Sequence, residues 1–149
     1  MSIEQATYER LSADPQVSAL VSSRIYPGLA PTSATTPIAP RPYVTVDRIT
    51  GQRRYTLAGA DTLPMSNVQI DIWAVSTTQR HAIFEAMRDS ICGNFRGNWG
   101  ATIQLAVRAC LFEPEIDSYV EPTEASEEPI FRRTINAKMF YREVVPSLA

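Results

Sequence analysis

Three residue types that often build active sites are scarce, because the 149 residues include one histidine, two cysteines and six glycines. His81, Cys92 and Cys110 do not have a metal-ligand spacing, and a zinc site usually needs four patterned ligands. The sequence contains no glycine-rich phosphate loop and no G-x-S-x-G nucleophile elbow. A Ser-His-Asp or Cys-His site would depend on His81, which we expect on the exposed side of a helix. We therefore predict no catalytic residues, metal ligands or cofactors, and no enzymatic activity.

The sequence also lacks a strong net charge and a long apolar run. A net charge of -2 and a pI near 5.4 give no general attraction to nucleic acid. Residues 1–12 do not combine a basic region with an apolar one, so we predict no signal peptide. No apolar run approaches the roughly 20 residues that span a bilayer. These absences predict folding in the cytoplasm with reduced thiols, a single Cys92–Cys110 disulfide being the alternative.

Lysine is nearly absent, since Lys138 is the only one, and arginine therefore carries the positive charge. Arginine makes planar, bidentate contacts and is enriched at protein interfaces. Four arginines surround the first predicted strand and the loop after it: Arg41, Arg48, Arg53 and Arg54. They are interpreted as surface charge for solubility, as a basic patch facing an acidic patch on another copy, or as DNA backbone contacts. The acidic net charge makes DNA contact the weakest interpretation.

A proline-rich run occupies residues 24–42 and raises the question of a linker between domains. The length of 149 residues favours a single domain, residues 1–149, and a hydrophobic content of 44% is enough for one core. Residues 1–23 supply only two short helical segments, which must pack on later strands. The run is therefore predicted to be an internal loop, ordered over 24–31 and more mobile beyond, with its second half able to reach a neighbouring subunit. Residues 144–149 are expected to be a short tail.

Capping signals predict three helical segments. A capping box at residues 2–5 begins a helix over about 4–13, and Asp14 with Pro15 begins a second helical segment. Another capping box at residues 76–79 precedes a helix that ends near Gly93.

Alternating patterns predict strands at residues 43–50, 66–75, from 103 onward and at 130–143, with a long loop over 51–65. In the second strand Ile70 and its apolar neighbours alternate with Asp71 and Trp73, so one face of the sheet is expected to be partly polar. Strands that follow each other through loops favour antiparallel pairing. The order of elements predicts an α+β fold: a single domain with a mainly antiparallel sheet of about four to five strands and helices packed on one face.

An acidic segment without basic residues precedes the last strand, with carboxylates at Glu113, Glu115, Asp117, Glu121, Glu124, Glu127 and Glu128. A solvated acidic loop is the favoured interpretation, and a partner-facing acidic surface is the main alternative. A catalytic or calcium site is disfavoured because the EF-hand loop pattern is absent. Trp73 and Trp99 are candidate partner anchors, although Trp99 in its glycine-rich turn is equally suited to pinning a loop.

Several segments in order resemble one family. RIYPGLAP, PYVTVDRITG, VQIDIWA, a capped helix and a charged loop followed by FRRTINAKMFYRE resemble the tail-completion proteins of long-tailed bacteriophages, also described as tail terminators or tail-to-head joining proteins. The resemblance covers about residues 5–143. It implies a small α+β subunit that forms a ring, commonly a hexamer, at the head-proximal end of the tail tube in the virion. Such a ring stops tube polymerisation, joins the tail to head-completion proteins and lets DNA pass through its lumen.

A ring requires two different, complementary surfaces on each subunit. We therefore hypothesise that the arginine-bearing loop and the acidic segment lie at subunit or partner contacts. The residues of this hypothesis are Arg48, Arg53, Arg54, Tyr55, Glu113, Glu115, Asp117, Glu121, Glu124, Glu127 and Glu128. Two alternatives stay open: a head-completion connector of the same neck region, and a protein-binding module unrelated to phages.

Overall fold

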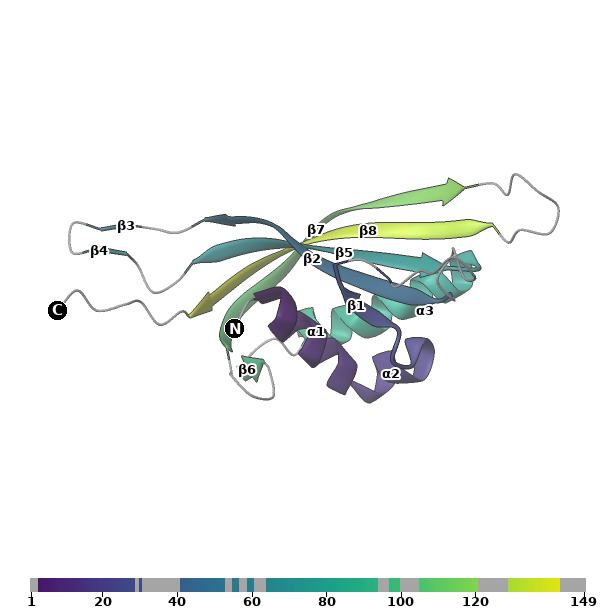
Figure 1. Ribbon diagram of the computed structural model, residues 1–149, viewed down its shortest axis with the longest axis horizontal. Coiled ribbons are helices and arrows are strands. Elements are labelled where there is room, and N and C mark those ends of the chain that lie inside the picture. The colour runs from purple at the N-terminus through teal and green to yellow at the C-terminus, as the bar shows by residue number, and fades with distance from the viewer. Residues whose placement is uncertain are drawn as a thin grey trace.

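The computed structural model describes residues 3–28, 30, 41–52, 55–56, 59–60, 64–93, 97–99, 105–120 and 129–142. A layer of helices packs on one face of a long, twisted sheet (Figure 1). This arrangement confirms the predicted α+β fold. No helix in the described part of the chain is both long and apolar enough to cross a membrane.

The first two helices are set by local signals that the sequence predicted. Helix α1 spans Ile3–Ala13 and buries Ile3, Ala6 and Leu11. Helix α2 spans Pro15–Val21, and the Asp14 carboxylate caps it by accepting hydrogen bonds from the backbone N–H groups of Gln16 and Val17. Helix α2 therefore begins where unpaired backbone donors find a side-chain acceptor, whereas Ser2 of the predicted capping box before α1 lies outside the described residues.

The third helix follows the strongest strand directly. Helix α3 spans Thr77–Arg88, and the Ser76 hydroxyl accepts a hydrogen bond from the Gln79 backbone N–H at 3.1 Å. A short π-helical turn, η1, continues it over Asp89–Gly93. Ile83, Met87 and Ile91 point into the core at helical spacing.

The main sheet has six strands in the order β1-β2-β5-β8-β7-β6. Their bounds are β1 Ile25–Pro27, β2 Tyr43–Gln52, β5 Met65–Ala74, β6 Gly97–Trp99, β7 Leu105–Val120 and β8 Ile130–Arg142. Strand β1 runs parallel to β2, and the other neighbouring pairs are antiparallel. A separate two-stranded sheet pairs β3, Tyr55–Thr56, with β4, Gly59–Ala60.

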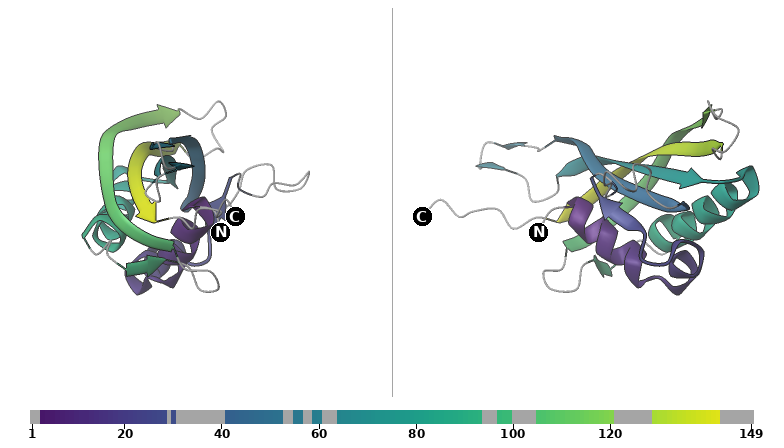
Figure 2. Two further views of the ribbon diagram at one scale, coloured as in Figure 1. Left: turned by 90° about the vertical axis from the view of Figure 1, so that its left-hand side faces the viewer. Right: turned by 45° about the vertical axis from the view of Figure 1, so that its right-hand side comes forward.

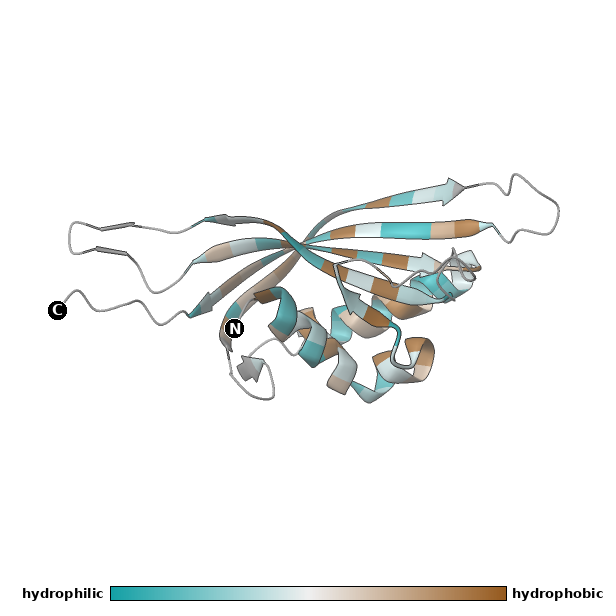
Figure 3. Cartoon of the chain, in the orientation of Figure 1, coloured by the Kyte–Doolittle hydropathy of each residue, from teal (hydrophilic) through white to brown (hydrophobic). Residues whose placement is uncertain are grey.

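The core lies between the helices and one face of the sheet. Strand β5 contributes Val68, Ile70 and Ile72, and β8 contributes Ile135, Ala137 and Met139, all of which are almost fully buried. Figure 3 shows the resulting alternation of apolar and polar residues along the long strands. The opposite face, which we call the open face, carries no helix (Figure 1).

Two stretches expected to be loops contain strands instead. Residues 113–120 belong to β7, because registers such as Asp117↔Arg133 continue the hairpin with β8 beyond a bulge between Phe112 and Glu115. The predicted loop over 51–65 includes the end of β2, all of β3 and β4, and the first residue of β5. Alternation of exposed and half-buried residues at a sheet edge lacks the apolar signal on which strand prediction rests.

Short edge strands account for the sheet being wider than expected. The ordered half of the proline-rich run supplies β1, which ends as Gly28 adopts φ +84°, a conformation that glycine tolerates and other residues avoid. The turn-rich stretch after η1 supplies β6, whose Trp99 is fully buried. Residues 32–40, for which greater mobility was predicted, lie outside the described residues, as do residues 29, 31 and 144–149.

The long strands extend past the helical layer at one end. Figure 1 shows β2, β5 and β8 continuing beyond α1 on its left-hand side, whereas at the other end α3 reaches about as far as β7 and β8. Viewed along the sheet, the strands twist and curl so that β7 arches around β8 (Figure 2). The sheet thus presents long edges and an open face that the helices of the same chain do not cover.

Candidate subunit and partner interface

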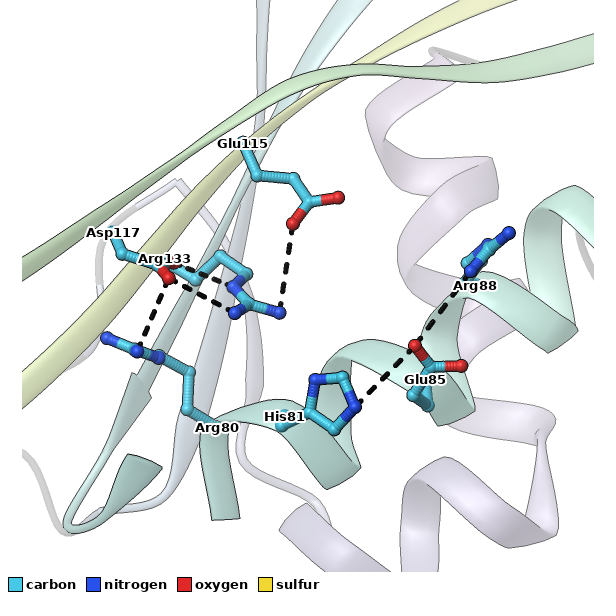
Figure 4. A network of polar contacts seen from close by, with 7 residues as sticks. All are labelled: Arg80, His81, Glu85, Arg88, Glu115, Asp117 and Arg133. Carbon is cyan, nitrogen blue, oxygen red and sulfur yellow. Dashed lines mark hydrogen bonds and ion pairs between the residues drawn. The ribbon is translucent and has the colours of Figure 1, made fainter. Parts of the chain in front are cut away.

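The acidic half of β7 is held by cations from β8 and α3 (Figure 4). Asp117 accepts hydrogen bonds from Nε and Nη2 of Arg133 at 2.7 and 3.1 Å, and Nη2 of Arg80 lies 3.3 Å from the same carboxylate. Glu115 lies 3.8 Å from Arg133. The charged pairs therefore bind the outer strand to the interior of its own subunit.

Both arginines of this network are largely buried. Arg133 is 11% exposed and lies over the Phe84 ring, whereas Arg80 is 12% exposed and lies over the Phe131 ring. Hydrogen bonding to Arg133 lowers the pKa of Asp117 below its usual value, and the same bond raises the pKa of Arg133. The pair stays ionised across the physiological range.

A second group of carboxylate contacts lies on the open face. Glu113 accepts a hydrogen bond from the Asn136 side chain at 3.1 Å and lies 3.9 Å from the Lys138 ammonium group. The single lysine of the chain therefore faces a carboxylate of the neighbouring strand. All three described carboxylates of the hypothesised acidic surface have cationic or amide partners within their own chain.

The open face also carries a buried carboxylate at its centre. Asp71 is 7% exposed and accepts hydrogen bonds from Gln69, Thr134 and two nitrogens of Arg132, at distances from 2.6 to 3.2 Å. These donors explain how a negative charge is tolerated within a sheet face. The arrangement confirms that the polar residues alternating along 66–75 share one partly buried face.

An aromatic row adjoins this carboxylate. Arg132 lies 4.5 Å above the Trp73 ring, Trp73 stacks on Tyr43 at 5.6 Å, and Tyr43 contacts Tyr26 at 6.1 Å. Burial raises the pKa of Tyr43, so its hydroxyl stays protonated. Tyr43, Trp73 and Arg132 line, together with Asp71, a groove of about 560 Å³ that is a candidate partner surface.

Arg48 lies on β2, and strands β5 and β8 separate it from the acidic half of β7. Its side chain is exposed and lines a hollow of about 280 Å³ with Ser66 and Tyr141, whose hydroxyl oxygens are 3.0 Å apart. The guanidinium lies over Gly51, where a methyl group would come within 3.2 Å of Nη1. Arg48 and the acidic residues of β7 are therefore separate surfaces of one subunit.

The remaining hypothesised residues have no described side chains. Tyr55 is placed only as the start of β3, and the others lie outside the described residues: Arg53, Arg54, Glu121, Glu124, Glu127 and Glu128. The structure thus places four of the hypothesised side chains, Arg48 on β2 and Glu113, Glu115 and Asp117 on β7.

The sequence analysis missed the roles of Arg80, Arg132 and Arg133. The sequence contained one signal for the contact of Arg133. If two strands pair symmetrically about residue 125, Val120 lies opposite Ile130 and Asp117 lies opposite Arg133, as observed. The same pairing brings an acidic strand beside a basic one, which is a stabilising cross-strand pattern. Arg80 had no such signal because its contact joins a helix to a strand far away in sequence.

Residues with possible chemistry take ordinary packing positions. His81 is 63% exposed and lies 3.8 Å from Glu85, as expected for a helix surface. Cys92 and Cys110 are free thiols with their sulfurs 3.7 Å apart, Cys110 being buried. Within the described residues no group of three or more His, Cys, Asp or Glu side chains could hold a metal ion.

The comparisons with known proteins begin with family models. The model for tail completion protein gp17 matches residues 5–113. The chain belongs to this tail completion family. The family is one of structural phage virion proteins, so the protein is a structural component of a phage tail. The match extends from α1 into β7 and ends at Glu113, before the ion pairs with Arg133.

A solved structure shares the fold of this tail completion protein. A chain from the virion of a native gene transfer agent particle superposes with a TM-score of 0.63 at 16% sequence identity, covering 93% of this chain and 95% of that one. No curated protein matches the sequence. The family match and the resemblance found in the sequence agree, and the structural match includes the region after residue 113.

Proposed function

We propose that this tail completion protein forms a ring, commonly a hexamer, at the head-proximal end of the tail tube. There it stops polymerisation of the tube protein and joins the tail to the head-completion proteins, while DNA passes through its lumen without sequence-specific binding. The family match over residues 5–113 carries the proposal, because completing a tail requires a protein at one of its ends. Its role is purely structural, with no catalytic residue and no cofactor.

The shape of the subunit supports this role. A ring uses heterologous contacts, in which two different surfaces of each copy meet. Arg48 and the carboxylates of β7 lie on separate parts of the sheet and so satisfy that geometric requirement. We propose that the arginine-bearing loop from Gly51 to Met65 and the acidic segment from Glu113 to Glu128 lie at subunit or partner contacts.

The intrachain ion pairs refine this proposal. Glu113, Glu115 and Asp117 already neutralise Lys138, Arg133 and Arg80, so their free charge toward a neighbour is small. We therefore propose that the contacts with a partner's cations involve Glu121, Glu124, Glu127 and Glu128, which lie outside the described residues.

Tails assembled without the protein test the proposal. Electron microscopy of tails from a phage lacking this chain should show tubes longer than those of the parent phage and without heads. Tails of normal length that lack heads would instead assign the protein to a connector joining head and tail. Complete virions of normal tail length would contradict both roles.

A further inference from the structure

The outer edge of β7 is unpaired along most of its length. On one side β8 pairs with β7 from Ala106 to Val120, whereas on the other side β6 pairs only with Leu105–Val107. In the part of the chain that the structure describes, no strand lies beside residues 108–120. Figure 1 shows this stretch as the outermost strand at the far end of the sheet. Its outward backbone N–H and C=O groups form a template for another strand.

Exposed apolar side chains gather on this edge. Leu111 is 55% exposed, Ile116 66% and Tyr119 50%. Leu111 and Ile116 oppose Lys138 and Thr134 on the open face, whereas Tyr119 opposes Phe131 on the helical face. Apolar groups thus flank the free backbone on both faces, and a strand added at this edge would cover both sides at once.

A second free edge lies across the sheet, on β2. Strand β1 pairs only with Val44–Val46, and the Gly28 N–H donates to the Val46 carbonyl where that pairing ends. No described strand lies on this side of residues 47–52. Ile49 in this stretch is 53% exposed. Of the five large apolar side chains found exposed in the described residues, four therefore lie on the two free edges, and Leu20 is the fifth.

We infer that the β7 edge of one copy pairs, antiparallel, with the β2 edge of the next copy. The inference rests on the proposed ring and names the contact that builds it. Strands β2, β5, β8 and β7 alternate in direction, so β7 and β2 of one subunit run oppositely. Repeating the subunit by rotation therefore brings an antiparallel β2 beside each β7. Two different edges meet, which is the heterologous contact that a closed ring requires.

The registers of the sheet show that the free stretches overlap. Cross-strand partners in successive strands link Arg48 of β2 to Val68, Ala137 and finally Phe112 of β7, so Arg48 and Phe112 lie at the same height in the sheet. In the same way, Gln52 is linked through Met65 and Phe140 to Ala109. A shift of one copy along its strands by a few residues keeps this overlap, because the free stretch of β7 is longer than that of β2, and brings Ile116 toward Ile49. Such a stagger between neighbours accompanies strand tilt in closed sheets.

The edge also carries features that restrict which strand it accepts. Pro114 has no N–H to donate, and it lies in the bulge of β7 between Phe112 and Glu115. Prolines and charges on an edge are common devices against indiscriminate pairing. They favour one defined partner strand over open-ended association. A second copy supplies such a strand in every subunit of the ring.

Hydrogen exchange tests the contact with the unaltered chain. Exchange is measured by mass spectrometry on the free protein and on the same chain in purified phage tails. Slowed exchange in tails for segments 108–120 and 47–52, with segment 65–74 of β5 unchanged, is the expected result. If the protein is present in tails as a ring but both edge segments exchange as fast as in the free protein, the inference is overturned and the proposed function is not. Protection of 108–120 without 47–52 also overturns it, since that pattern indicates a β7–β7 or foreign contact.

Paired substitutions give an independent test. Leu111→Lys with Ile116→Lys places two charges on the β7 edge without touching the core, and incorporation into tails should fall at least tenfold. The matched control is Leu20→Lys, at the exposed apolar position on α2, and circular dichroism verifies the fold of each variant. Normal incorporation of the edge variant overturns the inference. Absence of the unaltered protein from tails overturns the proposed function itself, and the inference with it.

Discussion

At the scale of single residues, a few buried or half-buried charges determine how the outer strands are held. Arg133 is only 11% exposed, so it needs the carboxylate that Asp117 supplies. Asp71 is equally dependent on its donors Gln69, Arg132 and Thr134. These side chains connect neighbouring strands with directional bonds that add to the backbone pairing of the sheet.

The Asp117–Arg133 pair predicts a pH dependence of stability. The hydrogen bond from Arg133 lowers the pKa of Asp117 in the folded protein. The contribution of Asp117 to the free energy of unfolding is therefore fully present above the usual aspartate pKa of about 4. This contribution is lost as the pH falls through the lower pKa of the folded protein. Asp117→Asn should reduce the free energy of unfolding at pH 7 by less than about 1 kcal/mol, because the carboxylate is 45% exposed.

Urea denaturation of the wild type and of Asp117→Asn at pH 7 and at pH 3 measures this effect. The difference between the two proteins should shrink at the lower pH. The control is Asp47→Asn, at an exposed aspartate of β2. A difference that is unchanged or larger at pH 3 would show that the Asp117 charge does not act through Arg133.

At the scale of elements, the sequence predicted what local signals encode. Capping residues located α2 and α3, and alternation located β2, β5 and β8, because these depend on neighbours along the chain. The parallel pairing of β1 with β2 and the short β6 depend on contacts far along the chain, so no local pattern revealed them. The acidic half of β7 was mistaken for a loop because ion pairs, and not apolar burial, hold it in the sheet.

The candidate interface was predictable to a smaller extent. The acidic segment and the arginines were visible as composition, but their partners were not, since Arg133 and Arg80 reach Asp117 only after folding. The groove with Trp73 and Tyr43 depends on strands β2, β5 and β8 being adjacent. Alternation correctly placed Trp73 on a polar face, whereas Trp99 was shown to be a core residue only by the structure.

The central strand of the sheet supports a prediction on stability. Ile70 of β5 is fully buried, between β2 and β8 and beneath the helices. Ile70→Ala should lower the free energy of unfolding by about 2–5 kcal/mol, because it removes apolar burial and leaves a cavity. Urea denaturation gives the value, with Ile49→Ala at an exposed position of β2 as the control. Equal losses for the two variants would contradict the core described for the sheet.

At the scale of the whole molecule, the fold separates stability from assembly. The helices and one sheet face build the core, while the open face and the outer edges of β2 and β7 lie outside it and are proposed to contact other chains. A tail protein needs this division because each subunit must fold before it joins a larger structure. Substitutions at assembly surfaces should therefore spare the monomer.

Charge reversal in the arginine-bearing loop tests that separation. Arg53→Glu with Arg54→Glu should weaken assembly at least tenfold, as these arginines are proposed to face a neighbouring copy or partner, and should leave thermal unfolding of the monomer unchanged. Arg88→Glu is the control, at an exposed arginine on α3. Incorporation into tails and ring formation, followed by native mass spectrometry, are the readouts. Normal rings from the double variant would remove this loop from the proposed contacts.

The position of the protein in the mature virion tests the central claim most directly. Cryo-electron microscopy of the tail and neck should show this α+β fold repeated in a ring between the head-completion proteins and the last layer of the tail tube. Density for the chain at the opposite end of the tail, or dispersed along the tube, would contradict the account.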